Sequence, residues 1–242
     1  MHLRKITLKS QQFPVRDCYP FNLELFSNGA PLVFTKPLTF FIGENGTGKS
    51  TLLKAIAIQC GIHIWRDEEG FQRRVYYKNR YAEELYRFLE IEWINGSVPG
   101  SYFDSEIFRY LAEVIDSWAQ PSPALFKYYG GDSLISRSHG QRHIQYFTAM
   151  YQKRGLHFLD EPENALSPKK QIELLKILKE TSAAGQVQFI AATHSPILLS
   201  YPEATIYSFD GRSIQEIRYQ ESDYYKIYRD FLNNPDRYLK EL

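Results

Sequence analysis

One eight-residue segment of the sequence has the spacing that phosphate binding requires. Residues 43–50 read GENGTGKS, which matches GxxxxGK followed by Ser or Thr, between a strand-prone and a helix-prone run. The glycines let backbone amides curl around phosphate oxygens, and the helix start adds partial positive charge. Lys49 would reach the terminal phosphates, and the Ser50 hydroxyl would face Mg²⁺. The alternative is a plain glycine-rich turn, but the full pattern should occur by chance in only about 1% of chains of this length. The residues expected to bind phosphate are Gly43, Asn45, Gly46, Thr47, Gly48, Lys49, Ser50 and Thr51.

Two adjacent acids end a second apolar run. Residues 156–162 read LHFLDEP, so Asp160 and Glu161 follow four residues typical of a buried strand. Asp160 would hold Mg²⁺ through water, and Glu161 would orient and polarise an attacking water. Paired acids at a strand end are also common as solvated groups. We therefore interpret the two acids as part of a site only because the phosphate-loop motif with Lys49 is also present.

A histidine ends the next apolar run. Residues 191–195 read AATHS, and His194 would hydrogen bond to a terminal phosphate and the attacking water. A lone histidine in this position is more often structural. Because 194 − 160 leaves 34 residues, one helix and one return strand fit between the two runs. We therefore expect His194 beside the strand that ends at Asp160.

A fourth motif, SHGQ at residues 138–141, opens the helix-prone run before Asp160, where Ser138 would also serve as a helix cap. In chain order, GENGTGKST, SHGQ, FLDEPENALS and ATHSP resemble the ABC-type ATPase superfamily, in which SHGQ matches the signature motif usually written LSGGQ. His139 replaces the usual glycine and Arg137 the usual leucine, which weakens the match to transporter subunits. The whole chain is similar to small stand-alone bacterial ATPases related to RecF and SMC nucleotide-binding heads.

The resemblance implies both a fold and an activity. The fold would be an α/β P-loop NTPase with a parallel core sheet, an N-terminal antiparallel β edge and an inserted, mainly helical lobe. ATP and Mg²⁺ would be the cofactors, with Ser50 and Asp160 at the metal and Glu161 and His194 catalytic. The chain would form an ATP-dependent head-to-tail homodimer. In that dimer Ser138, Gly140 and Gln141 of one copy would close over the γ-phosphate held by the other.

Two further family features have less definite counterparts. Residues 164–167, NALS, stand where the family has its D-loop, but Ser167 before Pro168 is more typical of a helix N-cap. For the Q-loop glutamine, neither Gln72 nor Glu106 is a clear match.

Adenine stacking has three candidates upstream of the phosphate loop. Arg16, Tyr19 and Phe21 have suitable planar side chains, although most aromatic residues in this segment would belong to the core.

The pattern along the chain predicts the elements that position these motifs. Strands are expected at 3–9, 21–26, 38–42, 156–159, 187–193, 205–208 and 214–218, and helices at 50–59, 81–93, 104–118, 140–152, 168–182 and 221–233. We expect a single ATPase domain over 1–242, with a helical lobe at about 61–137 and a helical tail at about 221–242.

Composition sets limits on the function. Hydrophobic residues are 43% of the 242, so a packed core is expected. The 29 basic and 28 acidic residues exclude a uniformly basic surface but not a local one, such as FQRRVYYKNRY at 71–81. Cys18 and Cys60 lack the spacing of a disulfide framework or zinc site. Without a long apolar segment, we expect no membrane insertion and a cytoplasmic location.

Three functions remain open. The first is an ATP-driven clamp or switch in nucleic-acid maintenance or defence, with nucleic acid as partner. The second is the ATPase subunit of a membrane transporter, and the third is an ATP-dependent regulator of a separate effector protein.

Overall fold

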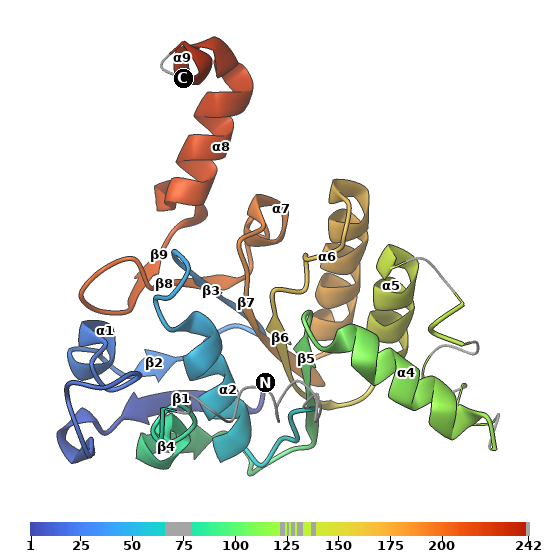
Figure 1. Ribbon diagram of the computed structural model, residues 1–242, viewed down its shortest axis with the longest axis horizontal. Coiled ribbons are helices and arrows are strands. Elements are labelled where there is room, and N and C mark those ends of the chain that lie inside the picture. The colour runs from blue at the N-terminus through green and yellow to red at the C-terminus, as the bar shows by residue number, and fades with distance from the viewer. Residues whose placement is uncertain are drawn as a thin grey trace.

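The structure is a computed structural model that describes residues 1–65, 79–121, 133–136 and 139–240, together with residues 124, 126 and 129. Its core is a six-stranded sheet in which the five strands from β5 to β8 run parallel and β9 runs antiparallel to β8 (Figure 1). The strands lie in the order β5 (Gly100–Asp104), β6 (Gly155–Asp160), β7 (Val187–Ala192), β3 (Leu38–Ile42), β8 (Thr205–Ser208) and β9 (Gln215–Ile217).

A smaller antiparallel sheet lies beside this core. Its order is β2 (Leu32–Val33), β1 (Leu3–Leu8) and β4 (Leu89–Trp93), with Ile6 opposite Ile91. The parallel core sheet and the N-terminal antiparallel edge are therefore confirmed.

Helices and turns connect the strands. The helices are α1 (Glu24–Ser27), α2 (Lys49–Gln59), α4 (Phe108–Ala119), α5 (His139–Met150), α6 (Pro168–Ala183), α7 (Pro196–Leu199), α8 (Asp223–Asn233) and α9 (Pro235–Leu239), and the 3-10 turns are Ser10–Gln12, Leu85–Phe88 and Tyr219–Glu221. None of the helices within the described ranges is long and apolar enough to cross a membrane.

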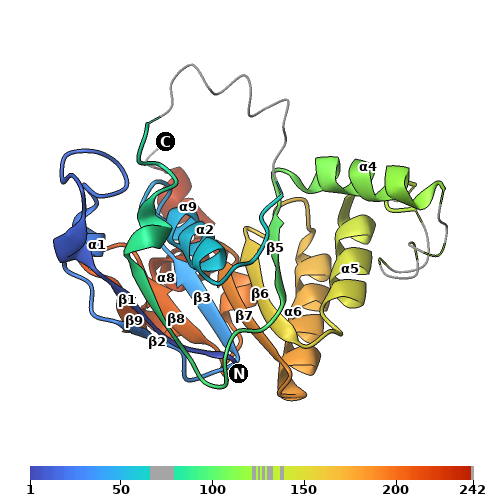
Figure 2. The ribbon, with the colours of Figure 1, turned by 90° about the horizontal axis from the view of Figure 1, so that it is seen from below.

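Both faces of the large sheet are buried, because successive side chains of a strand point to opposite faces. Phe41, Phe158 and Ile190 pack on the face covered by α2 and the small sheet. Their chain neighbours Phe40 and Leu159 pack on the other face, against α4, α5 and α6. Figures 1 and 2 accordingly place α5 on the far side of β5 and β6 from α2. The sheet thus separates the phosphate-loop helix from the SHGQ helix.

Two expectations for the secondary structure are wrong. Residues 21–26 form no strand, because Phe21, Leu25 and Phe26 are buried at a spacing that suits the short helix α1. Residues 81–93 form a 3-10 turn and β4 instead of a helix. The alternation of apolar residues and glutamates in LEIEW has period two, and β1 offers a pairing edge.

The described part of residues 61–137 is consequently not a mainly helical lobe. It contributes β4 to the small sheet and β5 to the large sheet, and α4 is its one long helix among the described residues.

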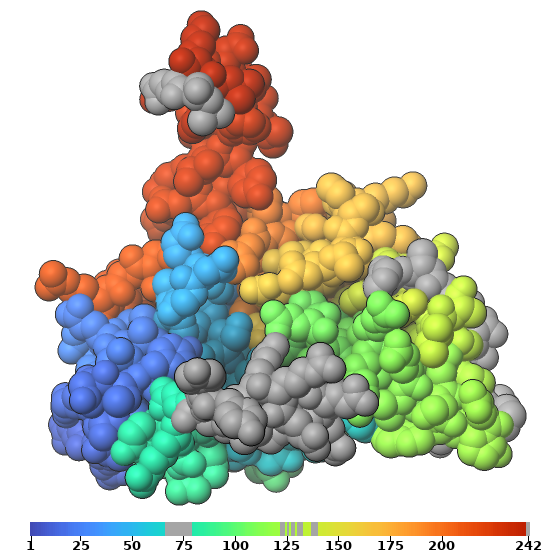
Figure 3. All heavy atoms as spheres, viewed as in Figure 1, coloured from blue at the N-terminus to red at the C-terminus, as the bar shows by residue number. Residues whose placement is uncertain are grey.

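The C-terminal helices extend away from the rest of the surface, as Figure 3 shows. The helix expected at 221–233 is confirmed by α8. Neither α8 nor α9 buries a residue, and Ile227, Leu232 and Leu239 are all more than half exposed.

Candidate active site

The phosphate loop lies between β3 and α2, as its spacing predicted. Gly48 is the N-cap of α2 at φ +98°, in the left-handed region that glycine tolerates. A Cβ on Gly48 would lie 2.8 Å from Phe26 Cζ and from Leu23 Cδ1. The loop therefore requires glycine here both for its conformation and for the close approach of α1.

Lys49 brings a buried cation to this loop. Its Nζ donates to the carbonyl oxygens of Gly43 at 2.5 Å and Glu44 at 2.8 Å. Burial lowers the pKa of Lys49, and the nearby carboxylates of Glu161 and Asp210 act in the opposite direction. A cation held by carbonyl oxygens beside a glycine loop is chemically suited to phosphate.

Ser50, in the first turn of α2, contacts Asp160, the last residue of β6. The Ser50 hydroxyl donates to Asp160 Oδ1 at 2.7 Å, and the buried Tyr102 hydroxyl donates to Oδ2 at 2.9 Å. Burial raises the pKa of Asp160, whereas Lys54, 3.7 Å away, and the Ser50 hydrogen bond lower it.

This donor pair fits Mg²⁺. A hydroxyl and a carboxylate are hard oxygen ligands, and Mg²⁺ usually takes few protein ligands besides phosphate and water. The described residues hold no group of three or more His, Cys, Asp or Glu side chains that could hold a metal ion by themselves.

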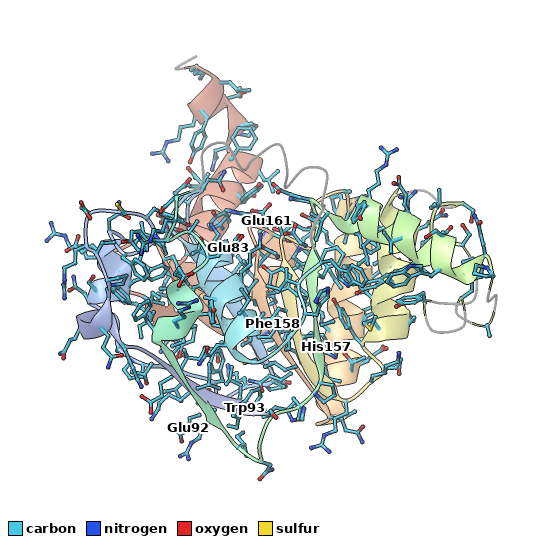
Figure 4. All side chains as sticks on the ribbon, turned by 60° about the horizontal axis from the view of Figure 1, so that its bottom comes forward. Glu83, Glu92, Trp93, His157, Phe158 and Glu161 are labelled. Atoms are coloured by element: carbon cyan, nitrogen blue, oxygen red, sulfur yellow. The ribbon has the colours of Figure 1, made fainter. Side chains whose placement is uncertain are left out.

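Glu161 and His194 face each other at the ends of neighbouring strands. Glu161 Oε1 lies 3.6 Å from His194 Nε2, and Asn164 donates to Glu161 Oε2 at 2.7 Å. Glu161 has φ +48°, and its amide donates to Ala192 O at 2.9 Å. Such backbone strain in a non-glycine residue is frequent at functional sites. Figure 4 shows Glu161 at the end of β6, beyond Phe158 and His157.

His194 is held at its backbone and at its ring. Its amide donates to Glu163 Oε1 at 2.5 Å, and its Nδ1 lies 2.5 Å from the Tyr224 hydroxyl. That hydroxyl also donates to Gly43 O at 3.0 Å, so α8 contacts the phosphate loop directly. Burial, followed by the charge of Lys49, lowers the pKa of His194.

A cavity of about 540 Å³ adjoins the loop on the side of α8. It is lined by apolar side chains of α1 and α8, including Leu25 and Ile227, and by Thr47, Asp210 and Tyr224. Asp210 Oδ1 also accepts the Glu44 amide at 2.6 Å, which braces the loop from the β8–β9 turn.

Of the expected SHGQ residues, Gly140 and Gln141 lie at the start of α5, on the other face of the sheet from α2. Ser138 is outside the described residues, Gln141 is exposed, and Gly140 lies in the first turn of α5. A Cβ on Gly140 would lie 3.6 Å from Ala165 O and 3.9 Å from Leu166 Cδ2, so α5 begins beside the segment 164–167. Ser167 accepts the Lys170 amide as the N-cap of α6, which confirms the expected cap.

The adenine-stacking candidates differ in position. Phe21 is in the core, with its ring centroid 4.7 Å from that of Phe13. Tyr19 is partly exposed, and its hydroxyl contacts that of Thr51 at the start of α2. Arg16 is exposed. Tyr19 is therefore the candidate that the structure brings to the phosphate loop.

The Q-loop candidates remain without a clear match. Gln72 is outside the described residues, and Glu106 is exposed just after β5. The amide of Glu106 donates to Asp104 at 2.9 Å.

Sequence reasoning missed several residues of the site. Tyr102 and Asp104 come from β5, which the sequence placed in a helical lobe, and Lys54 Nζ lies 3.0 Å from Asp104 Oδ2. The adjacent aromatic residues of SYFD, which favour a strand, were the available signal for β5. Tyr224 and Asp210 had no local signal, because only the tertiary fold brings them to the loop.

Two family models match parts of the chain. Residues 21–74 match one described as "AAA domain", and residues 122–200 match one described as "AAA domain, putative AbiEii toxin, Type IV TA system". No curated protein matches the chain.

Solved structures share the arrangement over nearly the whole chain. An SMC head bound to the C-winged helix domain of ScpA has a TM-score of 0.54 at 11% identity, covering 90% of this chain and 98% of that one. The ATP-binding cassette of an ABC transporter in its ADP conformation has a TM-score of 0.52 at 14% identity, covering 98% and 96%. The fold is that of the ABC/SMC-type P-loop ATPases.

This ABC/SMC-type fold accounts for the placement of the candidate residues. It brings Lys49, Ser50, Asp160, Glu161 and His194 to the carboxyl ends of adjacent parallel strands, where open α/β sheets bind their ligands.

Proposed function

We propose that this protein binds and hydrolyses ATP with Mg²⁺ as a nucleotide-dependent switch. This proposal rests on one cluster of side chains. The cluster consists of the buried Lys49 cation, the Ser50–Asp160 oxygen pair and the facing Glu161 and His194. Lys49 and the loop amides would bind phosphates, and Ser50 with Asp160 would hold the metal. Bound Mg²⁺ would neutralise charge on the transferred phosphoryl group. Glu161 would orient the attacking water with His194 beside it.

We further propose that two copies share each nucleotide. The start of α5 lies on the face of the sheet opposite to α2, so Gly140 is separated from the phosphate loop of its own chain. Gly140 is instead adjacent to the segment 164–167, which follows Glu161. A head-to-tail second copy would bring Ser138, Gly140 and Gln141 over the nucleotide, where a helix N-terminus attracts phosphate. Hydrolysis would then remove the shared contact and release the dimer.

The cellular role we propose is in nucleic-acid maintenance or defence. The similarity to an SMC head bound to a winged-helix domain supports a switch that acts with a protein partner. Of the basic run 71–81, residues 79–81 are described, and Arg80 is exposed with its guanidinium 5.4 Å from the Tyr81 ring centre. Basic and aromatic groups together suit nucleic acid.

Two alternatives have specific support. The fold similarity to the cassette of an ABC transporter favours a transporter subunit, which would require a separate membrane protein. The match at 122–200 to a family model described with a toxin system favours a regulator of a separate effector protein.

Salt-dependent DNA binding that stimulates ATP turnover would support the nucleic-acid role, and absence of both effects would contradict it.

The proposed activity is tested with Glu161→Gln, which keeps the side-chain size and removes the charge. We expect ATP binding within about twofold of the original protein, because the phosphate contacts remain, and turnover reduced roughly 10²- to 10⁴-fold. Glu92→Gln is the control, because Glu92 lies on β4 far from Glu161 (Figure 4). Turnover that survives Glu161→Gln would contradict the assigned role of this carboxylate.

A further inference from the structure

The hydroxyl of Tyr224 lies between the phosphate loop and His194. It is 3.0 Å from Gly43 O and 2.5 Å from His194 Nδ1, and the two rings have centroids 5.5 Å apart. Tyr224 belongs to α8, a helix that buries none of its residues. This hydroxyl is therefore a specific contact between the C-terminal helix and two parts of the candidate site.

Hydrogen-bond chemistry decides where the protons lie. A carbonyl oxygen can only accept, so the proton of Tyr224 must point to Gly43 O; otherwise two oxygens 3.0 Å apart would face each other without a proton. Gly43 O also accepts a hydrogen bond from Lys49 Nζ, so both lone pairs of this carbonyl oxygen are used. With its single proton engaged, Tyr224 Oη must accept from His194, so Nδ1 of the imidazole carries the hydrogen.

This assignment fixes the other ring nitrogen of His194. A neutral imidazole has one N–H, so Nε2 then presents a lone pair; it can accept from water but cannot donate to a terminal phosphate, which corrects the phosphate contact expected from the sequence. Nε2 is buried, has no hydrogen-bond partner among the described residues, and lies 3.6 Å from Glu161 Oε1. Burial and the nearby Lys49 lower the pKa of His194, which favours the neutral ring. Two acceptors at this separation suit a donor that bridges them.

We propose that Tyr224 is a positioning residue that holds His194 in its Nδ1–H tautomer, so that Nε2 and Glu161 act as paired acceptors for the protons of one water. The claim rests on the proposed hydrolytic role of His194 and deepens it. The water would donate one O–H to each acceptor. As its oxygen bonds to the γ-phosphorus, the bond from that phosphorus to the β–γ bridging oxygen would break, ADP would leave with that oxygen and its negative charge, and Glu161 would take the released proton. Because Tyr224 is on α8, displacement of this helix would release the ring of His194 and slow turnover.

The test is the tautomer of His194 in the nucleotide-free protein, read from the ¹⁵N shifts of its ring nitrogens. Labelled histidine gives signals for all six histidines. The variant His194→Gln assigns the pair that belongs to His194. We expect a protonated Nδ1 and an unprotonated Nε2 in the original protein. In Tyr224→Phe, which keeps the ring and removes the hydroxyl, we expect the Nε2–H form to become populated.

Turnover provides a second, separate measurement. We expect Tyr224→Phe to lower kcat about tenfold, the effect of one lost hydrogen bond, with ATP affinity unchanged. Tyr225→Phe is the matched control, because Tyr225 is the next residue of α8 and its ring packs 4.8 Å from that of Tyr219. This control should leave both the tautomer and kcat unchanged.

The outcomes separate the two proposals. An Nε2–H tautomer in the original protein, or the same tautomer with and without the hydroxyl, would overturn the role of Tyr224 whatever the ATPase activity. A changed tautomer with unchanged kcat would overturn its link to turnover. A protein without ATPase activity but with the expected tautomers would refute the proposed function while leaving the hydrogen-bond assignment supported.

Discussion

Replacing Gly48 with alanine should destabilise the phosphate loop for two separable reasons. At φ +98° an alanine is strained by about 1–2 kcal/mol. Its Cβ would also lie 2.8 Å from Phe26 Cζ, and because Phe26 is fully buried its ring has little room to move. Overpacking of this kind costs about 1–3 kcal/mol. The free energy of unfolding should therefore fall by roughly 2–5 kcal/mol in total.

Gly46→Ala separates the two effects. Gly46 also has a positive φ, +83°, but nothing lies within 4 Å of an added Cβ, so we expect only the strain of about 1–2 kcal/mol. Urea unfolding of the nucleotide-free variants, followed by circular dichroism, measures both free energies. The excess for Gly48→Ala, about 1–3 kcal/mol, reports the contact with α1. Equal losses, or a larger loss for Gly46→Ala, would refute the steric argument.

Three further predictions address charge, capping and pH. Lys49→Met should abolish ATP binding in calorimetry while the protein stays folded, because the phosphates lose their buried counter-charge; retained affinity would be evidence against this role. Ser167→Ala should lower the free energy of unfolding by about 1 kcal/mol through loss of the α6 cap, and Ser167→Asp should restore it; an unchanged urea midpoint in the alanine variant would exclude the cap. Burial lowers the pKa of His157 to about 4, so between pH 6.5 and 4 the unfolded chain binds a proton that the folded protein does not, and stability falls as the pH falls. Between pH 7 and 5 the free energy of unfolding of the original protein should fall by about 2 kcal/mol more than that of His157→Gln. His63→Gln, at an exposed histidine, is the control. Equal falls for the original protein and His157→Gln would contradict the burial of His157 as the cause.

The sequence predicted the parts of the fold that depend on local pattern. The largely apolar runs of β3, β6 and β7 identified the buried parallel strands, and the placement of Gly43–Ser50 between β3 and α2 followed from spacing alone. Ser167 before Pro168 predicted the start of α6 to the residue. These features are decided by chemistry within a few residues of the chain.

The parts that the sequence did not predict depend on tertiary pairing. β4 exists because β1 provides an edge for it, and β5 adds to β6 with Asp104 opposite Asp160. The contact of Tyr224 with Gly43 joins residues 181 positions apart, so no local pattern could indicate it. The hydrogen bond from Tyr102 to Asp160 likewise depends on the pairing of β5 with β6, because a tyrosine in a strand is by itself typical of the core.

If each nucleotide is held between two copies of the chain, nucleotide should control whether the protein sediments as a monomer or a dimer, which can be measured with two variants. With ATP and Mg²⁺, Glu161→Gln should sediment as a dimer because bound nucleotide is not turned over. The double variant Glu161→Gln, Gly140→Asp should still bind ATP but sediment as a monomer, because a carboxylate at the start of α5 repels phosphate. A monomeric Glu161→Gln protein, or a double variant that dimerises equally well, would contradict the account.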